Sequence, residues 1–218
     1  MPPRLAIIAT HPIQYYAPFF RLLAHRDALD VHVFYNWRGA TETAYDPGFD
    51  SDVTWDIPLL EGYPFTFVPN RSWDPGTHHF GGLINPELVG RIKAWDPDAV
   101  LVYGWNYASH LWALLRLHGH VSILFRGDST LIDDRTAARE WLRRTVLRAI
   151  YRYVDHARPV GTHSRQYFAA HGFEASEMTW VPHAVDNDRF MNPPDDAEQQ
   201  ATEWRHQLGI KDDHLVFL

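Results

Sequence analysis

The sequence has 218 residues, 45% of them apolar and 14% aromatic, which is enough to bury a substantial core in one large domain or slightly more. Cysteine is absent, so a disulfide framework, a thiolate nucleophile and a cysteine-based zinc site are excluded. The 20 Lys and Arg residues against 27 Asp and Glu give a net charge of -7, which argues against a nucleic-acid-binding protein. The first apolar run, residues 5–9, is too short for a signal peptide or a membrane span, so we expect a cytoplasmic protein.

Short apolar runs alternate with longer amphipathic segments along the chain. This alternation predicts an α/β fold, with a parallel sheet flanked by helices. The apolar runs predict strands at residues 5–9, 31–35, 65–69, 99–103, 121–125, 158–161 and 178–182. The amphipathic segments predict helices at residues 15–26, 85–95, 107–117, 134–154 and 162–171, and another that ends near residue 208.

The sequence changes character after residue 190. We expect an N-terminal domain over residues 1–190, a linker with a short helix over 191–212, and the first strand of a second domain over 213–218. Because a chain seldom ends inside a core strand, we expect this chain to be the first half of a longer protein.

The turn after the first predicted strand contains candidate ligand-binding residues. Residues 10–14 lead from the strand into the helix that begins at Tyr15, and such turns face the carboxyl edge of a parallel sheet, where ligands bind. His11 and Gln14 are therefore candidates, and the nearby helix N-terminus favours an anionic group. The alternative is that His11 only makes a hydrogen bond to the backbone at the helix entry. A Gly-x-Gly-x-x-Gly pattern is absent here, which counts against a dinucleotide cofactor.

A long segment from residue 40 to residue 64 shows little periodicity and has no Lys or Arg between Ala40 and Glu61. Its carboxylates are interleaved with aromatic residues, a combination that suits a polyhydroxylated ligand; a solvated acidic loop is the alternative. The residues concerned are Glu42, Tyr45, Asp46, Phe49, Asp50, Asp52, Trp55, Asp56 and Glu61.

A second loop, residues 70–83, contains the adjacent pair His78 and His79. Adjacent residues seldom chelate one ion, and the spacing suggests no carboxylate partner to complete a site. We therefore expect no metal there.

The predicted strand at residues 121–125 runs into a charged turn. Arg126 offers a fork of donors, Gly127 permits a tight turn, and Asp128 places a carboxylate two residues from the guanidinium. These side chains should lie at the carboxyl edge, beside the turn formed by Gly104, Trp105 and Asn106. The alternative is a turn that its Arg and Asp merely solvate.

The helix predicted at residues 134–154 is acidic at its start and rich in arginine along its length. Its apolar residues recur every four positions, so we expect a buried stripe of Leu142, Val146, Ile150 and Val154. Another face carries Trp141, Arg144, Arg148 and Arg152. A basic face that bears Trp suits peripheral contact with anionic lipid, and a solvated face is the alternative.

The segment from residue 157 to residue 190 carries a distinctive set of motifs. A Gly-Thr-x-Ser turn leads a helix, His-Gly follows, and Val-Pro-x-x-Val-Asp precedes Arg-Phe, at residues 161–164, 171–172, 181–186 and 189–190. This segment resembles the N-terminal domain of GT-B glycosyltransferases, in particular the retaining enzymes of glycosyltransferase family 4. Three positions depart from the family pattern: the first turn lacks its glycines, Arg126 stands where His is usual, and Ala184 stands where Gly is usual.

The resemblance implies a Rossmann-like acceptor-binding domain, followed by a donor domain that binds a nucleotide sugar such as a UDP- or GDP-sugar. It implies hexosyl transfer to a sugar or lipid-linked acceptor hydroxyl, in glycan, glycolipid or cell-envelope polysaccharide synthesis, with no cofactor or metal in this domain. On this basis we expect Arg126 to meet the donor, and Asp128 with His11 to orient or deprotonate the acceptor. The expected substrate-binding residues are Gln14, Tyr15, Trp105, Asn106, Gly127, Ser129, His163, Ser164, His183 and Asp186.

Two other classes of function stay open. A GT-B nucleotide-sugar 2-epimerase shares the two-domain cleft but uses no acceptor, and the acidic, aromatic loops between residues 40 and 83 argue against it. A non-catalytic Rossmann-like module that binds a ligand without turnover is the other alternative.

Overall fold

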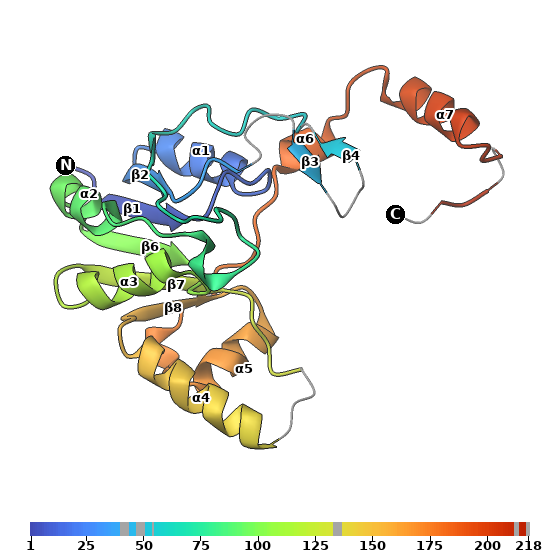
Figure 1. The fold of residues 1–218 in the computed structure, drawn as a ribbon. Helices are drawn as coiled ribbons and strands as arrows, with labels where there is room; N and C mark the ends of the chain where they lie inside the picture. The colour runs from blue at the N-terminus through green and yellow to red at the C-terminus, as the bar shows by residue number, and fades with distance from the viewer. Residues whose placement is uncertain (40–43, 47–50, 54, 133–136, 212–213, 217–218) are drawn as a thin grey trace. The chain divides into compact units, whose positions relative to one another are not determined.

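A computed structural model describes residues 1–39, 44–46, 51–53, 55–132, 137–211 and 214–216 of the chain. Its centre is a sheet of six parallel strands in the order β5-β2-β1-β6-β7-β8 (Figure 1). The strands are β1 (Arg4–Ala9), β2 (Asp30–Tyr35), β5 (Phe65–Phe67), β6 (Ala99–Tyr103), β7 (Ser122–Gly127) and β8 (His156–Pro159). The order reverses between β1 and β6, which is the topology of a Rossmann-like domain, so the predicted fold class is confirmed.

Helices follow most of the strands, as the alternating sequence pattern predicted. They are α1 (Ala17–His25), α2 (Leu88–Trp95), α3 (Ala108–Leu117), α4 (Ala137–Tyr151), α5 (Thr162–Ala170), α6 (Asn187–Met191) and α7 (Ala197–Gln207), with short 3-10 helices η1 (Phe80–Gly82) and η2 (Ala175–Glu177). An antiparallel hairpin of β3 (Ala44–Asp46) and β4 (Ser51–Val53) lies within the segment that the sequence suggested was irregular. Among the described residues, no helix combines the length and the apolar character needed to cross a membrane.

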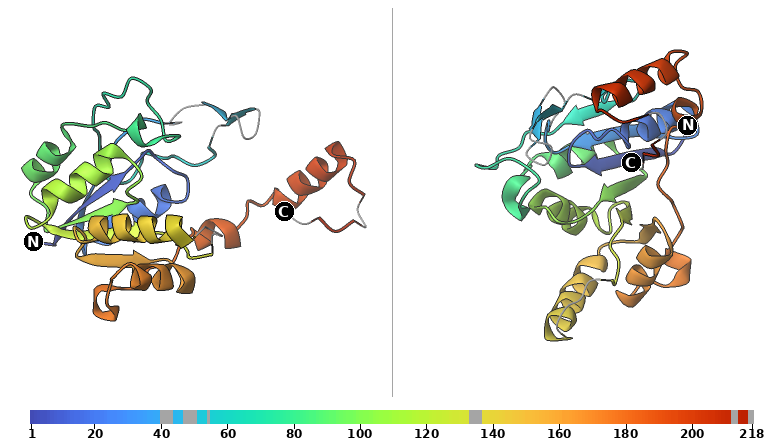
Figure 2. Two further views of the ribbon diagram at one scale, coloured as in Figure 1. Left: turned by 60° about the horizontal axis from the view of Figure 1, so that its bottom comes forward. Right: turned by 90° about the vertical axis from the view of Figure 1, so that its right-hand side faces the viewer.

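Each face of the sheet is buried in its own core. Ile8, Val102 and Phe125 belong to the core formed with α2, α3, α4 and α5, while Ile7 and Val33 belong to the core formed with α1 and Leu59. Figure 2 shows the sheet and its helices from two further directions. Consecutive strand residues are therefore both buried; Ile7 and Ile8 are each 0% exposed. This explains why the strands read as unbroken apolar runs in the sequence.

The buried stripe predicted for α4 is wrong at its N-terminal end. The helix residues that reach the core are Leu147, Ile150 and Tyr151, and Val154 is buried just beyond the helix, which ends at Tyr151 and not at the predicted residue 154. Leu142 and Val146 are 58% and 47% exposed. The physical reason is the helix period: each four-residue step overshoots a turn by roughly 40°, so a row of such steps winds around the helix and leaves the core.

The chain divides into two compact units, Met1–Ala184 and Val185–Leu218. The domain boundary expected at residue 190 stays a prediction. Two of the strands expected near the C-terminus differ from the structure. The strand predicted at 178–182 forms only a single parallel bridge to β8, between Ala157 and Met178, although Val181 N still donates to Pro159 O at 2.9 Å. The strand predicted at 214–218 is not formed at residues 214–216, and residues 217–218 lie outside the described residues.

Candidate functional site

The candidate site lies at the carboxyl ends of β1, β6 and β7. The strand order reverses between β1 and β6, and at such a point the following turns separate and leave room for a ligand. The first turn is held by Ile13 O, which accepts hydrogen bonds from Tyr16 N and Ala17 N, each at 3.0 Å. On β6 the turn begins at Gly104, whose positive φ of 73° is one that other residues adopt only with strain.

Aromatic and charged side chains from the three strands meet at this edge. The ring of Tyr16, at the start of α1, lies 4.6 Å from the ring of Tyr103 at the end of β6. The guanidinium of Arg126 on β7 lies 5.9 Å from the Tyr103 ring. Burial raises the pKa of Tyr16, while the positive charge of Arg126 opposes that rise, so the two side chains are electrostatically coupled. The cluster therefore buries a cation among phenol groups that stay protonated at neutral pH.

Arg126 is a strand residue, whereas the sequence placed it in the turn beyond the strand. Only 7% of it is exposed, and its Nη1 and Nη2 groups donate to the carbonyl oxygens of Val181 and Pro182 at 2.6 and 3.1 Å. Its Nε is buried and has no hydrogen-bond partner among the described residues. The guanidinium thus anchors the 181–182 segment to the carboxyl edge, while its charge remains close to the tyrosines.

The residues that follow Arg126 leave the sheet. Gly127 ends β7 at a crowded position, since a Cβ there would lie 3.2 Å from Phe125 Cε1 and 3.4 Å from Phe168 Cζ. Asp128 and Ser129 are exposed. Burial raises the pKa of Tyr15, and the nearby Asp128 carboxylate raises it further. The structure therefore brings together Tyr15, Arg126 and Asp128, which the sequence had assigned to one site from separate segments.

His11 also belongs to the first turn, and its contacts are with Thr10, Trp37 and Gly39. Its Nδ1 is 2.9 Å from Thr10 Oγ1, its ring packs edge-on against Trp37 at 5.7 Å, and a Cβ on Gly39 would lie 2.8 Å from its own Cβ. Burial lowers the pKa of His11, so the imidazole is neutral at pH 7 and one ring nitrogen can accept a proton. Among the described residues, no hydrogen bond or ion pair joins it to Arg126 or Asp128.

The other predicted substrate-binding residues are dispersed. Trp105 packs against the core, Gln14 is half-buried, and Asn106, His163 and His183 are exposed. Ser164 is buried, because its Oγ accepts from Val160 N and Gly161 N and donates to Gly161 O, which makes it a brace of the turn before α5. Asp186 belongs to the Val185–Leu218 unit, where it caps α6 by accepting from Arg189 N at 3.2 Å.

The acidic, aromatic loop is only partly visible. Glu42, Phe49 and Asp50 lie outside the described residues, and the side chains of Tyr45, Asp46 and Asp52 are not described. Trp55 packs against the core under α1, which is a structural role, and Asp56 and Glu61 are exposed.

Sequence reasoning missed His110, which is 0% exposed at the start of α3. Its Nδ1 lies 3.0 Å from Gly104 O, so the imidazole holds the turn at the end of β6. Burial lowers its pKa to about 4, which keeps the ring neutral. The only sequence signal was its position, six residues after the strand-end Gly104 and in the first turn of the following helix.

Asn85 is a second residue that the sequence did not single out. Its Nδ2 donates to Asn36 O and Val68 O at 2.8 and 2.9 Å, and its Oδ1 accepts from Ser109 Oγ. It thereby ties the carboxyl end of β2, the segment after β5 and the start of α3 to one another. The amide of Asn36 is itself 0% exposed and has no side-chain partner among the residues that the structure describes.

The strand order, the two buried faces of the sheet and the polar residues at its switch point, where the strand order reverses between β1 and β6, define a Rossmann-like α/β domain of the kind found in GT-B proteins. Neither protein-family profiles nor curated protein sequences match the chain. Solved structures do match it. Anabaena Alr3699/HepE in complex with UDP and glucose matches with a TM-score of 0.58 and 17% identity over 94% of this chain and 50% of that one.

Two further structures match equally well. The complex of the same Anabaena protein with UDP-glucose has a TM-score of 0.58 and 16% identity, over 94% of this chain and 50% of that one. A UDP-N-acetylglucosamine 2-epimerase from Rickettsia bellii has a TM-score of 0.58 and 17% identity, over 97% of this chain and 52% of that one. The chain thus spans about half the length of the structures that it matches, and at these identities the similarity establishes the fold.

Proposed function

We propose that this chain is the acceptor-binding half of a GT-B glycosyltransferase, which moves a hexosyl group from a nucleotide sugar to an acceptor hydroxyl. The observation that carries the proposal is the cluster of Tyr15, Tyr16, Tyr103, Arg126 and Asp128 at the switch point of the sheet. Two matched structures support the class of substrate, since one holds UDP with glucose and another UDP-glucose. The resemblance to glycosyltransferase family 4 supports retention of configuration at the anomeric carbon.

In the proposed reaction, different residues at the carboxyl edge of the sheet act on the leaving diphosphate and on the acceptor hydroxyl. Breaking the anomeric C–O bond places negative charge on the leaving diphosphate, and a fixed cation stabilises that charge without reorganisation. Arg126 is held rigidly by Val181 O and Pro182 O, so its charge is pre-organised for that purpose. In this proposal it also positions the 181–182 turn.

The acceptor hydroxyl needs a group that orients it and takes its proton. Asp128 is an exposed carboxylate beside Tyr15, and His11 is a neutral imidazole in the first turn. We assign Asp128 to the acceptor, because its carboxylate can accept the proton of the acceptor hydroxyl. His11 would provide a second polar contact to the acceptor. The donor sugar would be a UDP- or GDP-sugar bound by a further C-terminal domain.

An epimerase is the competing function, and a specific observation favours it: the Rickettsia bellii 2-epimerase matches the chain as well as the UDP-bound structures do. An epimerase of this kind would act on a single nucleotide sugar and would need no acceptor. A non-catalytic module would bind the nucleotide sugar and leave it unchanged. The three functions predict different products from the same substrate.

The test uses the longest polypeptide encoded by the reading frame that contains this chain. It is incubated with UDP-glucose, GDP-mannose or UDP-N-acetylglucosamine, with and without sugar and polyprenyl-linked acceptors, and products are separated chromatographically. Release of nucleotide diphosphate that depends on an acceptor supports the transferase. A 2-epimer formed in D₂O with deuterium at C2 and without an acceptor supports the epimerase, and binding without either product supports the module.

We also propose that α4 contacts the cytoplasmic face of a membrane, where a lipid-linked acceptor would be available. Trp141, Leu142 and Val146 are exposed on this helix, together with Arg148, and Arg152 is exposed directly after its end. Exposed apolar groups beside arginines suit insertion at the boundary of an anionic bilayer. Co-sedimentation with phosphatidylglycerol vesicles, but not with phosphatidylcholine vesicles, is expected, and Trp141→Ala with Leu142→Ser should abolish it. Equal recovery of the variant and the unaltered protein in the pellet would contradict the proposal.

A further inference from the structure

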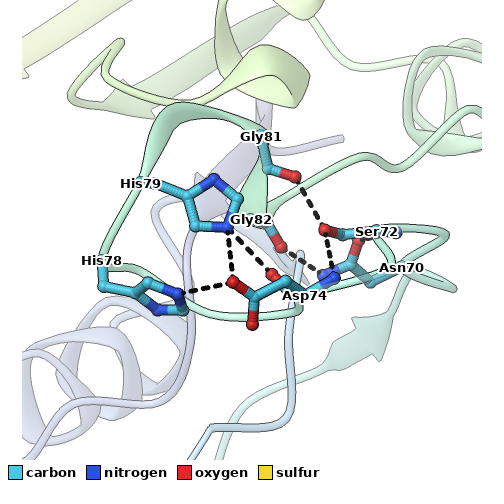
Figure 3. A network of polar contacts seen from close by, with 7 residues as sticks. All are labelled: Asn70, Ser72, Asp74, His78, His79, Gly81 and Gly82. Atoms are coloured by element: carbon cyan, nitrogen blue, oxygen red, sulfur yellow. Dashed lines mark hydrogen bonds and ion pairs between the residues drawn. The ribbon is translucent and has the colours of Figure 1, made fainter.

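The loop between β5 and α2 gathers three potential metal ligands outside the tyrosine and arginine cluster. Asp74, His78 and His79 each offer one ligand atom, and these atoms lie within 4.8 Å of one another (Figure 3). Asp74 supplies the carboxylate that the sequence spacing did not suggest for the histidine pair. The reason is that the loop folds back on itself between residues 74 and 79.

The loop is held in this shape by its own backbone and side chains. Asn70 Nδ2 donates to Gly82 O at 2.8 Å, and Ser72 Oγ donates to Gly81 O at 2.7 Å while accepting from Asp74 N. A Cβ on Gly82 would lie 2.1 Å from Gly76 O, so the close approach of these two segments requires glycine. The arrangement of the three ligands is therefore built into the loop.

The loop is also tied to the carboxyl edge of the sheet. Tyr107, which precedes α3, donates from its hydroxyl to Thr77 O at 3.1 Å. The backbone N–H of Ser109 in α3 donates to Leu83 O at 3.1 Å, at the C-terminal end of the loop. These contacts, one between the ligands and one at the end of the loop, limit the freedom that the ligands would lose on binding an ion.

Two of the three distances between ligand atoms fit a small tetrahedral ion, and the third, between the two imidazoles, is within 4.8 Å. His78 Nε2 and His79 Nε2 lie 3.0 and 3.3 Å from the same oxygen, Asp74 Oδ2. Two ligands about 2.1 Å from Zn²⁺ at a tetrahedral angle are about 3.4 Å apart, so only small adjustments would be needed to admit the ion. Two imidazoles and a carboxylate are also donors that Zn²⁺ prefers, and three protein ligands leave the fourth position open.

We propose that Asp74, His78 and His79 form a binding site for one divalent transition-metal ion, with Zn²⁺ as the best fit. The Asp74 oxygen and the two Nε2 atoms are the ligands, and an exchangeable ligand such as water completes the tetrahedron. The side chains are partly exposed, His79 least of them at 34%, so the ion can enter from solvent. The site is independent of the proposed glycosyl transfer.

The test measures Zn²⁺ affinity of the untagged chain by competition with a chromophoric chelator. The variants are His78→Gln combined with His79→Gln, and Asp74→Asn alone. The matched control is His118→Gln with His120→Gln, which removes two exposed histidines separated by one residue. Loss of groups that only support a ligand typically costs about 10- to 100-fold in affinity, so loss of the ligands themselves should cost at least about 100-fold.

The unaltered chain and the control should each bind one Zn²⁺ with equal affinity, and Co²⁺ in its place should show the intense visible absorption of four-coordinate cobalt. Circular dichroism in EDTA establishes that the variants fold. Should the double variant misfold, imidazole NMR of the unaltered chain decides, because Zn²⁺ must shift His78 and His79 and leave His118 and His120 unchanged. Equal Zn²⁺ affinity in the double variant and the unaltered chain, or shifts spread over all four histidines, would overturn the proposal.

Discussion

Acidification should destabilise the protein through His110, which holds the turn at the switch point. This imidazole is 0% exposed and its Nδ1 bonds to Gly104 O, so protonation would place a charge where water cannot reach it. The perturbation is a fall in pH from 7 to about 4.5, applied to the unaltered protein and to His110→Asn. Asparagine keeps a donor near the position of Nδ1 but does not titrate.

The magnitude follows from the two protonation equilibria. Burial lowers the pKa of His110 from 6.5 to about 4, a difference of about 2.5 pH units, and each unit corresponds to about 1.4 kcal/mol. Below pH 6.5 the unfolded chain binds a proton at this residue while the folded protein does not, so stability falls as the pH falls. The full contribution is about 3 kcal/mol, present above pH 6.5 and lost as the pH approaches about 4.

The assay is urea denaturation at both pH values, with the imidazole of His110 followed by NMR over the same range. The unaltered protein should lose about 2 to 3 kcal/mol more than His110→Asn, because only this residue differs in its titration. Other carboxylates and histidines affect both proteins alike and cancel in the comparison. An imidazole that titrates near pH 6.5, or equal losses in the two proteins, would refute the reasoning.

The remaining predictions concern the candidate site and α4. Arg126→Ala should lower turnover by the complete enzyme by about 10²- to 10³-fold, since it removes a fixed cation. Unchanged turnover in a product assay would show that Arg126 does not stabilise the leaving diphosphate. Asp128→Asn should lower turnover about 100-fold, and it should also move the ultraviolet titration of Tyr15 to lower pH, because the neighbouring negative charge is lost. Leu147→Ala should cost about 2 to 5 kcal/mol in urea unfolding, whereas Leu142→Ala should cost less than about 0.5 kcal/mol; similar costs would contradict the observed rotation of the helix.

The pattern of apolar residues was sufficient to predict the strands of the sheet. Residues 5–9 and 99–103 read as unbroken apolar runs, and they form β1 and β6 with both faces covered. The polar turns after these strands were predicted to share one edge, because all strands of a parallel sheet end on the same side. That inference brought His11, Arg126 and Asp128 to the same edge of the domain before any distance was known.

Only the tertiary structure decided what the individual side chains contact. Arg126 bonds to carbonyls of Val181 and Pro182, far along the chain, and no local pattern encodes that pairing. The approach of Asp74 to the histidine pair depends on a loop whose backbone closes between Gly76 and Gly82.

The local sequence therefore determined the six strands of the parallel sheet and their order along the chain, because strand periodicity is set by the backbone, but it did not reveal the β3–β4 hairpin. The rotation of α4, the neutral state of His110 and the ligand geometry of the Asp74 loop were decided by packing between distant segments. Burial and hydrogen bonding depend on which groups lie close together in the folded protein, and a periodic sequence pattern does not specify those tertiary contacts.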